Sequence, residues 1–366
     1  METSAFDYEL PEAAIAQHPL EERDAARLLV DRGAGSAPEN RIVRELPDLL
    51  EPGDLLVLNT TRVLPARLAL FKETGAAVEV LLLERRDGGV LSDSGRSRWE
   101  ALVRPGRKLP PGTVVRPREG SGLEVTVGAD LGDGRREVVI DVDGPLLDVL
   151  EHFGRMPLPP YITEALEEQE RYQTVFSERP ASAAAPTAGL HLTADVLQRC
   201  ADRGIGRADV ELVVGLGTFR PIATDRIEDH LMHGEVFRVP QETLDACRRT
   251  KAKGGRVVAV GTTAVRALES AVALGVTEGR TELFIHGDFE FALVDRLMTN
   301  FHLPKSSLIV MIDAFIGSRW RELYSDALRD GYRFLSFGDA MLLTRRKCRV
   351  PCGRVLEHEN PTLTSV

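Results

Sequence analysis

The chain has 366 residues, a length that favours two domains over a single hydrophobic core. Hydrophobic residues make up 43% of it and charged residues 28%, which is close to average globular usage and excludes a mainly disordered or fibrous protein. Its formal net charge of -10 argues against a protein that coats nucleic acid nonspecifically, while leaving room for local phosphate contacts.

The N-terminal stretch METSAFDYELPEAAIAQ carries acidic residues where a signal peptide would be basic, and it lacks an apolar stretch. No apolar run in the chain reaches the length of a membrane span. The four cysteines are dispersed, and the stretch CRVPC has no second cysteine or histidine pair at zinc spacing. We therefore expect a cytoplasmic protein with no membrane partner and no metal site.

Six short β-type runs lie between residues 64 and 142, separated by clusters of Gly, Pro, Asp and Ser. They read RLALF, AAVEVLLLE, RWEALVR, TVVRP, LEVTVG and REVVIDV. Short strands with turn signals at this spacing are typical of a small barrel or sandwich. We predict an inserted small β-barrel domain over residues 62–150.

From about residue 154 onward, apolar runs alternate with helical patterns. The strand candidates are VELVVGLG, RVVAVGTT and TELFI, and the helix candidates are ADVLQRCADR, QETLDACRRTKAK and AVRALESAVAL. Thr193 is placed to cap the first of these helices, and Gly275 to end the last. This alternation predicts a mixed-sheet α/β main domain built discontinuously from residues 1–61 and 151–345, followed by a flexible C-terminal tail over residues 346–366.

Three loops that follow predicted strands combine small residues, hydroxyls and a charged or imidazole group. They are GLGTFRP at 215–221, GTTAVRALES at 261–270 and TNFHLPKSS at 299–307. Because open α/β sheets bind ligands beyond the carboxyl ends of their strands, we expect a polar site there. The pattern GLG indicates either a close approach to a ligand or only a turn.

The loop GTTAVRALES opens a helix whose free N–H groups suit an anionic or polar ligand group. Thr262 or Thr263 is equally compatible with a plain helix cap. Arg266 and Glu269 stand three residues apart, which by itself predicts only an ordinary surface pair.

Four histidines lie beside Gly, Pro, Thr or Asn in predicted loops, namely His191, His230, His233 and His302. Imidazole titrates near physiological pH, so we expect at least one of them to be catalytic. In APTAGLHLT, His191 is either held for chemistry or only the polar end of the segment that enters the next helix. The chain lacks the G-x-S-x-G, Walker, H-E-x-x-H and C-x-x-C patterns, which leaves the common hydrolase, NTPase and zinc-protease classes without support.

Motifs over about nine tenths of the chain resemble the S-adenosylmethionine:tRNA ribosyltransferase-isomerases of the queuosine pathway. They include PGDLLVLNTTRVLPARL, WEALVRPGRKL, GRMPLPPYI, AAPTAGLHLT, VGLGTFRPI, MHGEVF, VVAVGTTAVRALES, TNFHLPKSSL and YRFLSFGDAMLL. The resemblance implies transfer and isomerisation of the ribosyl moiety of S-adenosylmethionine onto 7-aminomethyl-7-deazaguanine at the wobble position of tRNA. Epoxyqueuosine-tRNA would form, with release of adenine and methionine. The resemblance implies that S-adenosylmethionine is a substrate and that no further cofactor is needed. We expect the protein to be a monomer.

That chemistry needs a base beside the sulfonium-activated 5′ carbon and a proton for the departing adenine. With the resemblance as guide, our proton-transfer candidates are His191, His233 and His302, with Glu235 and Asp229 as possible partners. The substrate-binding candidates are Pro186, Thr187, Gly189, Gly215, Gly217, Thr218, Phe219, Arg220, Gly261, Thr262, Thr263, Arg266, Glu269 and Asn300.

Seven basic residues and one acid lie between Arg96 and Arg118, which indicates either a solvated strand face or an RNA contact. The resemblance favours RNA contact. Our candidates for binding the tRNA phosphates are Arg62, Arg67, Arg104, Arg107 and Lys108.

Two other functions compete with this one. A conventional S-adenosylmethionine-dependent RNA methyltransferase would carry a glycine-rich loop after the first strand of its sheet, which this order of elements does not supply. A noncatalytic RNA-binding protein would need aromatic stacking platforms, yet Trp99 is the only tryptophan of the β-rich region and no tyrosine lies there. The chain departs from the resembled pattern at Thr60, where an acidic or amide residue is usual, and at FIHGDFEF, where a proline-tyrosine segment is usual.

Overall fold

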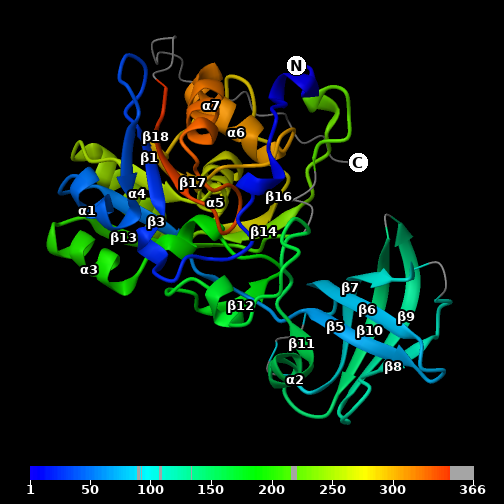
Figure 1. Cartoon of the computed structure of the whole chain (residues 1–366). Coiled ribbons are helices and arrows are strands. Elements are labelled where there is room, and N and C mark those ends of the chain that lie inside the picture. Colours follow the sequence, from blue (N-terminus) through cyan, green and yellow to red (C-terminus); the bar gives the residue numbers. More distant parts are fainter. Residues whose placement is uncertain (89–90, 92, 107–108, 133, 216–220, 347–366) are drawn as a thin grey trace, which may run out of the picture.

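A nine-stranded mixed sheet forms the centre of the larger part of the molecule (Figure 1). The computed structural model describes residues 1–88, 91, 93–106, 109–132, 134–215 and 221–346. The strands lie in the order β16 (Glu278–Thr281), β14 (Glu235–Arg238), β13 (Gly206–Leu212), β3 (Leu55–Asn59), β15 (Val257–Val260), β17 (Arg296–Asn300), β18 (Ala340–Thr344), β1 (Arg27–Asp31) and β2 (Glu39–Ile42). Strands β13, β3, β15 and β17 run parallel, so their carboxyl ends share one edge of the sheet.

Both faces of this sheet are buried, because successive side chains of its strands point to opposite faces. In β3, Leu55 and Val57 belong to one core cluster, whereas Leu56 and Leu58 belong to another. The first cluster also contains residues of α4 (Gln241–Ala252), α5 (Thr262–Leu274), α6 (Ser307–Ile316) and α7 (Trp320–Arg329). The second contains residues of α1 (Leu46–Leu49) and α3 (Ala194–Asp202), which gives three layers.

The predicted helices of this α/β body are confirmed. Thr193 caps α3, since its Oγ1 accepts a hydrogen bond from the Val196 N–H at 3.2 Å. Helix α5 ends at Gly275, whose φ of 66° lies in the left-handed region that favours glycine. Helix α4 covers all but the end of its predicted range.

The predicted strand TELFI is wrong in extent, because β16 ends at Thr281. The Leu283 N–H donates to Thr281 Oγ1 at 3.1 Å instead of continuing the ladder. Ile285 turns into the main core, where it is buried. The segment after β16 therefore lies outside the sheet ladder.

A second sheet closes on itself as a small antiparallel barrel, which Figure 1 shows beside the α/β body. All six predicted strands form, and β8 pairs with both β9 and β5, which completes the barrel. Alternate residues of these strands fill its interior. The strands are β5 (Arg67–Lys72), β6 (Ala77–Arg85), β7 (Gly95–Arg104), β8 (Val114–Arg116), β9 (Leu123–Gly132) and β10 (Arg135–Val142).

The chain enters and leaves the barrel at neighbouring points. It enters after β4 (Thr61–Val63) and returns through α2 (Leu146–Phe153) and β11 (Gly154–Arg155), which pairs with β5. At Gly154 a Cβ atom would lie 1.8 Å from the Pro65 carbonyl oxygen, so only glycine fits the junction. Next, β12 (Arg179–Ser182) pairs in parallel with β4. An ion pair of 2.9 Å between Arg280 and Glu84 joins β16 to the barrel strand β6.

Short 3₁₀ helices complete the fold. They are η1 (Thr3–Phe6), η2 (Glu12–Ala14), η3 (Arg23–Ala25), η4 (Val43–Glu45), η6 (Gln169–Tyr172), η7 (Thr187–His191), η9 (Ile227–Asp229) and η10 (Gly317–Arg319). Within the described ranges, no helix combines the length and apolar character needed to cross a membrane.

Candidate active site

The principal cavity lies at the carboxyl ends of β15 and β17, at the edge where the sequence predicted a site. Its open space, including solvent at the mouth, is about 600 Å³. It is lined by Tyr161, Ala185, Pro186, Thr187, Ala188, Val214, Gly261, Thr262, Thr263, Thr299, Asn300, Phe301, His302, Leu303, Ser306, Leu308, Leu335 and Ser336.

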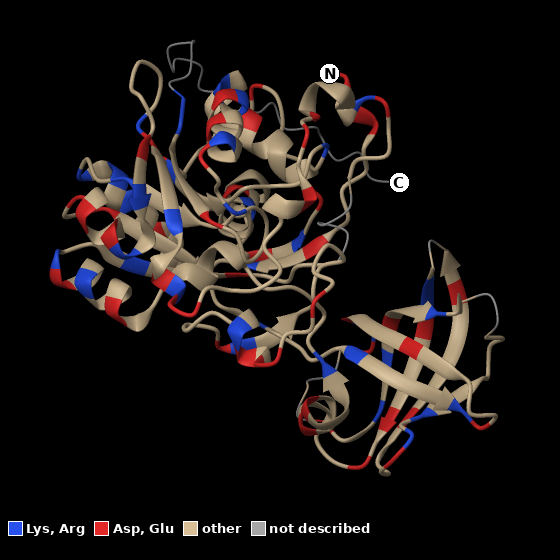
Figure 2. Ribbon diagram, in the orientation of Figure 1, with Lys and Arg blue, Asp and Glu red and all other residues tan. Residues whose placement is uncertain are grey.

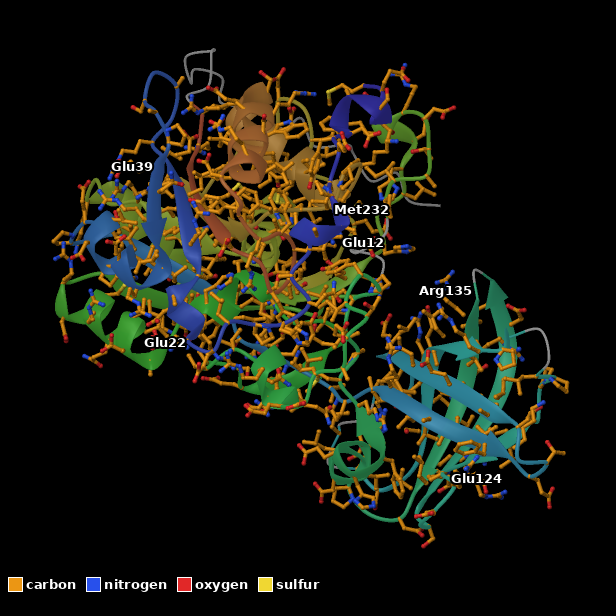
Figure 3. All side chains as sticks on the ribbon, in the orientation of Figure 1. Glu12, Glu22, Glu39, Glu124, Arg135 and Met232 are labelled. Atoms are coloured by element: carbon orange, nitrogen blue, oxygen red, sulfur yellow. The ribbon has the colours of Figure 1, made fainter. Side chains whose placement is uncertain are left out.

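A smaller cavity, with about 370 Å³ of open space including solvent at its mouth, adjoins the first. The two share Val214, Thr262, Thr263 and Leu308 in their walls. Figure 3 shows Met232, another lining residue, on the side of the α/β body nearer to the barrel. The rest of the lining is mostly apolar except for one buried charged pair. It comprises Leu212, Glu235, Arg266, Leu283, Phe284, Ile285, Ser307 and Met311.

Among the histidines of the described chain, His302 alone lines one of these cavities. Its Nε2 lies 3.0 Å from Thr299 Oγ1, and its backbone N–H donates to the Tyr324 hydroxyl at 3.0 Å. Burial lowers the pKa of His302 to about 3 because it disfavours the charged imidazolium. His302 is therefore a neutral, fixed imidazole at physiological pH.

His191 lies behind the wall of the principal cavity rather than in it. It is buried at the end of η7, where Asn300 Nδ2 lies 3.1 Å from its Nε2. Burial, with Arg333 nearby, lowers its pKa to about 4. A neutral imidazole accepts the amide N–H, so His191 fixes the orientation of the Asn300 side chain.

Asn300 connects the two sides of the principal cavity. Its Oδ1 accepts from Thr187 Oγ1 at 2.9 Å, and its Nδ2 also lies 3.3 Å from the Asp339 carbonyl oxygen. Together with His191, these bonds tie the segment after β12 to the end of β17. Pro186 lines the cavity beside Thr187, but Gly189 does not. A Cβ there would lie 2.8 Å from the Phe176 ring, so this glycine allows close packing behind the wall.

Arg266 and Glu235 form a buried ion pair in the wall of the smaller cavity, with exposures of 4% and 6%. Arg266 does not form the ordinary surface pair with Glu269 that the spacing predicted. Glu269 is also buried, and its carboxylate accepts the backbone N–H groups of residues 292, 293 and 294. Burial raises the pKa of Glu269. Its side chain lines neither cavity, and its bonds to the backbone support the fold.

The amino end of α5 forms part of both cavities. Gly261 precedes the helix with a φ of 91°, and no side chain caps the helix, so neither threonine is a plain cap. Thr263 Oγ1 is buried without a hydrogen-bond partner among the described residues. Thr262 and Thr263, whose N–H groups have no acceptor within the helix, line both cavities.

The remaining candidates lie elsewhere. The side chains of His233 and Asp229 are exposed and line neither cavity, although the His233 carbonyl accepts from Arg266 Nη2 at 3.2 Å. The Gly215 N–H donates to Glu235 at 3.2 Å. Four predicted substrate-binding residues lie outside the described ranges, namely Gly217, Thr218, Phe219 and Arg220.

Two polar residues of the principal cavity, Tyr161 and Ser336, were not predicted from the sequence. The Tyr161 hydroxyl lies 2.7 Å from Ser336 Oγ, and burial raises the pKa of Tyr161. Both residues stand in stretches that carry the family resemblance, PLPPYI and LSFGDA, which was the available signal. The two stretches are far apart in the chain, so their meeting was not visible in the sequence.

The predicted RNA-binding arginines face acidic neighbours. Arg62 bonds Glu170 at 2.6 Å, and Arg67 bonds Glu79 at 3.3 Å, whereas Arg104 is exposed. Figure 2 shows acidic and basic positions interspersed over the barrel strands. Acids on adjacent strands thus offset part of the positive charge that the sequence count indicated. Arg107 and Lys108 lie outside the described residues.

A metal-binding cluster of three or more His, Cys, Asp or Glu side chains does not occur in the part of the chain that the structure describes. Of the four cysteines, Cys200 and Cys247 are buried free thiols in the two core clusters. Burial raises their pKa values to about 11 and about 12. Both are therefore protonated core residues at neutral pH.

Comparison with known proteins identifies the family. The family model described as a queuosine biosynthesis protein matches residues 3–343. The S-adenosylmethionine:tRNA ribosyltransferase-isomerase of Rubrobacter xylanophilus is 49% identical over 345 residues, which cover 94% of this chain and 98% of that protein. The enzyme of the same name from Desulfitobacterium hafniense is 46% identical over 349 residues, covering 94% and 100%.

A solved structure supports the same relationship. The crystal structure of S-adenosylmethionine tRNA ribosyltransferase from Thermotoga maritima is 38% identical, with a TM-score of 0.52, and the match covers 92% of this chain and 99% of that chain. The family model and these relatives span nearly the whole chain, as the motifs predicted. The chain therefore belongs to the queuosine biosynthesis protein family.

Proposed function

We propose that this protein is an S-adenosylmethionine:tRNA ribosyltransferase-isomerase. It transfers and isomerises the ribosyl moiety of S-adenosylmethionine onto 7-aminomethyl-7-deazaguanine at the wobble position of tRNA, giving epoxyqueuosine-tRNA with release of adenine and methionine. The observation that carries the proposal is the meeting of family motifs from distant segments around one polar cavity at the carboxyl edge of the sheet. S-adenosylmethionine is consumed as a substrate, and no other cofactor is proposed.

His302 is the proposed proton-transfer residue. A base must remove a proton from the 5′ carbon next to the sulfonium, and a neutral imidazole has a lone pair for this step. The low pKa of His302, about 3, keeps it unprotonated across the physiological range but also makes it a weak base, so the proposed role rests on its position in the cavity. The Thr299 hydroxyl at 3.0 Å orients its ring. Imidazolium formed in this way would be a strong acid, suited to return the proton to departing adenine.

His191 is proposed as a positioning residue that acts through Asn300. The Nε2 of His191 accepts from the side-chain amide of Asn300, and the same amide accepts from Thr187. Asn300 and Thr187 both line the principal cavity. Loss of His191 would release that amide and weaken substrate binding more than it slows the chemical step. We also propose His233 as a proton-transfer residue with Asp229 as its partner. Their side chains are exposed and would reach a reacting atom only after a movement of their loop.

We also propose that tRNA contacts the barrel through Arg67 and Arg104, and that Arg62 contributes at the junction. The acceptor nucleotide must leave the anticodon stack to enter a cavity, as bases of single-stranded loops can. Action on tRNA by a monomer in the cytoplasm completes the proposal. Sedimentation of the free protein and of its tRNA complex would measure the stoichiometry.

The test is product analysis with tRNA that carries 7-aminomethyl-7-deazaguanine. Wild-type protein should release adenine and methionine in equal amounts, whereas a methyltransferase would yield S-adenosylhomocysteine and a noncatalytic RNA-binding protein would consume nothing. His302→Gln should lose about two orders of magnitude or more in turnover. His152→Gln is the matched control, since His152 is exposed on α2. Full turnover by the His302 variant would refute its role, and no adenine from the wild type would refute the function.

A further inference from the structure

The smaller cavity contains a pair of opposite charges that the proposed proton transfers do not use. Arg266, from α5, and Glu235, from the start of β14, bond to each other in its wall. Most of the other lining side chains are apolar. Removing two charges from water is costly unless they serve a further purpose or are fully bonded. The pair places one positive and one negative group in the wall of a mostly apolar cavity, where a ligand with charges of its own would meet both.

The bonds of Arg266 leave part of its donor capacity available. Its Nε donates to the Leu283 carbonyl at 3.1 Å, and its Nη2 donates to the carbonyls of His233 and Thr281 at 3.2 and 3.3 Å. Its Nη1 bonds Glu235. A guanidinium has five N–H groups, so one N–H on Nη1 has no acceptor among the described residues. The guanidinium is thus held firmly and can still donate.

The amino end of α5 supplies further donors one turn away from Arg266. Residues three and four apart lie on the same face of a helix, so Thr262 and Thr263 lie above Arg266. Their backbone N–H groups have no acceptor within the helix, and the buried Thr263 Oγ1 has no partner in the described part of the chain. A negative group placed here would meet backbone amides, a hydroxyl and, below them, a guanidinium.

We propose that the smaller cavity holds the α-amino-carboxylate end of S-adenosylmethionine. The carboxylate lies toward the amino end of α5 and Arg266, and the α-ammonium lies toward Glu235. The adenosyl part occupies the principal cavity, and the sulfonium lies where the two cavities share Val214, Thr262 and Leu308. This inference rests on the proposed function, since it assigns parts of that substrate to parts of that site.

The proposal makes the carboxylate a determinant of donor specificity. Decarboxylated S-adenosylmethionine keeps the adenosyl group, the sulfonium and the ammonium, and lacks only the carboxylate. Titration calorimetry with both compounds measures binding without turnover, and kcat/KM with acceptor tRNA measures use. Wild-type protein should prefer S-adenosylmethionine by roughly tenfold to a hundredfold in both, as expected for charge-assisted hydrogen bonds.

Two variants test the residues. Thr263→Val keeps the shape of the side chain and removes its hydroxyl, and it should reduce the preference by roughly threefold to tenfold. The double variant Arg266→Gln with Glu235→Gln removes both charges together, so no lone buried charge is left to unfold the protein. It should bind both compounds with nearly equal affinity.

The matched control is Arg256→Gln with Asp54→Asn. This pair bonds at the opposite edge of the same sheet, at the starts of β15 and β3, and should leave the preference unchanged. Equal affinity of the wild type for both compounds would overturn the proposal, as would a folded Thr263→Val or double variant with the full preference. Should the double variant fail to fold, Thr263→Val decides the outcome. Selective binding without adenine release would support this subsite and refute the ribosyl transfer.

Discussion

Two buried histidines give the protein a defined response to acid. In the folded chain the pKa of His191 is lowered to about 4 and that of His302 to about 3, while both return toward 6.5 on unfolding. Between pH 6.5 and 4 the unfolded state therefore binds more protons than the folded state. The free energy of unfolding should fall as the pH drops through this window, by about 1.4 kcal/mol per pH unit for each histidine.

Urea unfolding of wild type and His302→Gln at several pH values between 7 and 4.5 measures this effect. The two curves should converge as the pH falls, because the variant lacks one of the two contributions. The comparison of the two curves is needed because the raised pKa of Glu269 increases the free energy of unfolding as the pH falls over the same range. That contribution is present in both proteins and cancels in the comparison. His152→Gln, on the surface of α2, should run parallel to wild type. If the curve of His302→Gln ran parallel to that of the wild type, the pKa of His302 would not be lowered in the folded protein.

The return of the chain from the barrel depends on Gly154. A Cβ at this position would lie 1.8 Å from the Pro65 oxygen and 2.5 Å from the Leu150 oxygen, and both are backbone atoms that cannot move independently. Gly154→Ala should destabilise the barrel by about 3 kcal/mol. Gly106→Ala is the matched control, because its Cβ would meet nothing within 4 Å, and it should cost less than about 0.5 kcal/mol.

The two tryptophans allow the measurement to report on the barrel, since Trp99 lies inside it and Trp320 lies in α7. In a Trp320→Phe background, fluorescence of Trp99 follows barrel unfolding in urea. Equal midpoints for the two glycine variants would contradict the close approach at Gly154.

The elements that could be predicted from the sequence are those specified by nearby residues. The six barrel strands show alternating apolar residues and glycine-rich turns, and Thr193 and Gly275 mark helix ends by their own chemistry. Polar loops after parallel strands also predicted the edge of the sheet that carries the cavities. The boundaries between the two domains stay a prediction.

Contacts between distant segments could not be predicted. The sequence predicted a pair between Arg266 and Glu269, three residues away, whereas Arg266 pairs with Glu235 in the folded chain. That pairing depends on β14 adding to the edge of β13, which no local pattern encodes. The same limit hid the contact between Tyr161 and Ser336 and the role of His191 behind the cavity wall.

For the molecule as a whole, charge balance governs how tRNA would bind. The net charge is -10, and barrel arginines have acidic neighbours, so the attraction for phosphate must be local.

Arg104→Ala should weaken tRNA binding and reduce the salt slope of log K by about one. Glu79→Gln removes the partner of Arg67 and should strengthen binding. Filter binding at several salt concentrations measures both, with Arg329→Gln on α7 as the control. An unchanged slope for Arg104→Ala together with unchanged affinity for Glu79→Gln would exclude the barrel as the RNA-binding surface.

The adjacent entry and exit of the barrel have a consequence for the order of folding. Barrel strands pair mainly with their sequence neighbours, whereas β3 must find β13 far along the chain, with Leu55 opposite Gly206. Closing a long flexible loop costs entropy that grows with its length. A barrel that forms first replaces most of that loop by a rigid body whose two ends already touch. Pulse-labelled hydrogen exchange should then protect amides of β6 and β7 before those of β3, and the reverse order would contradict it. The barrel would thus speed assembly of the very sheet whose edge carries the cavities.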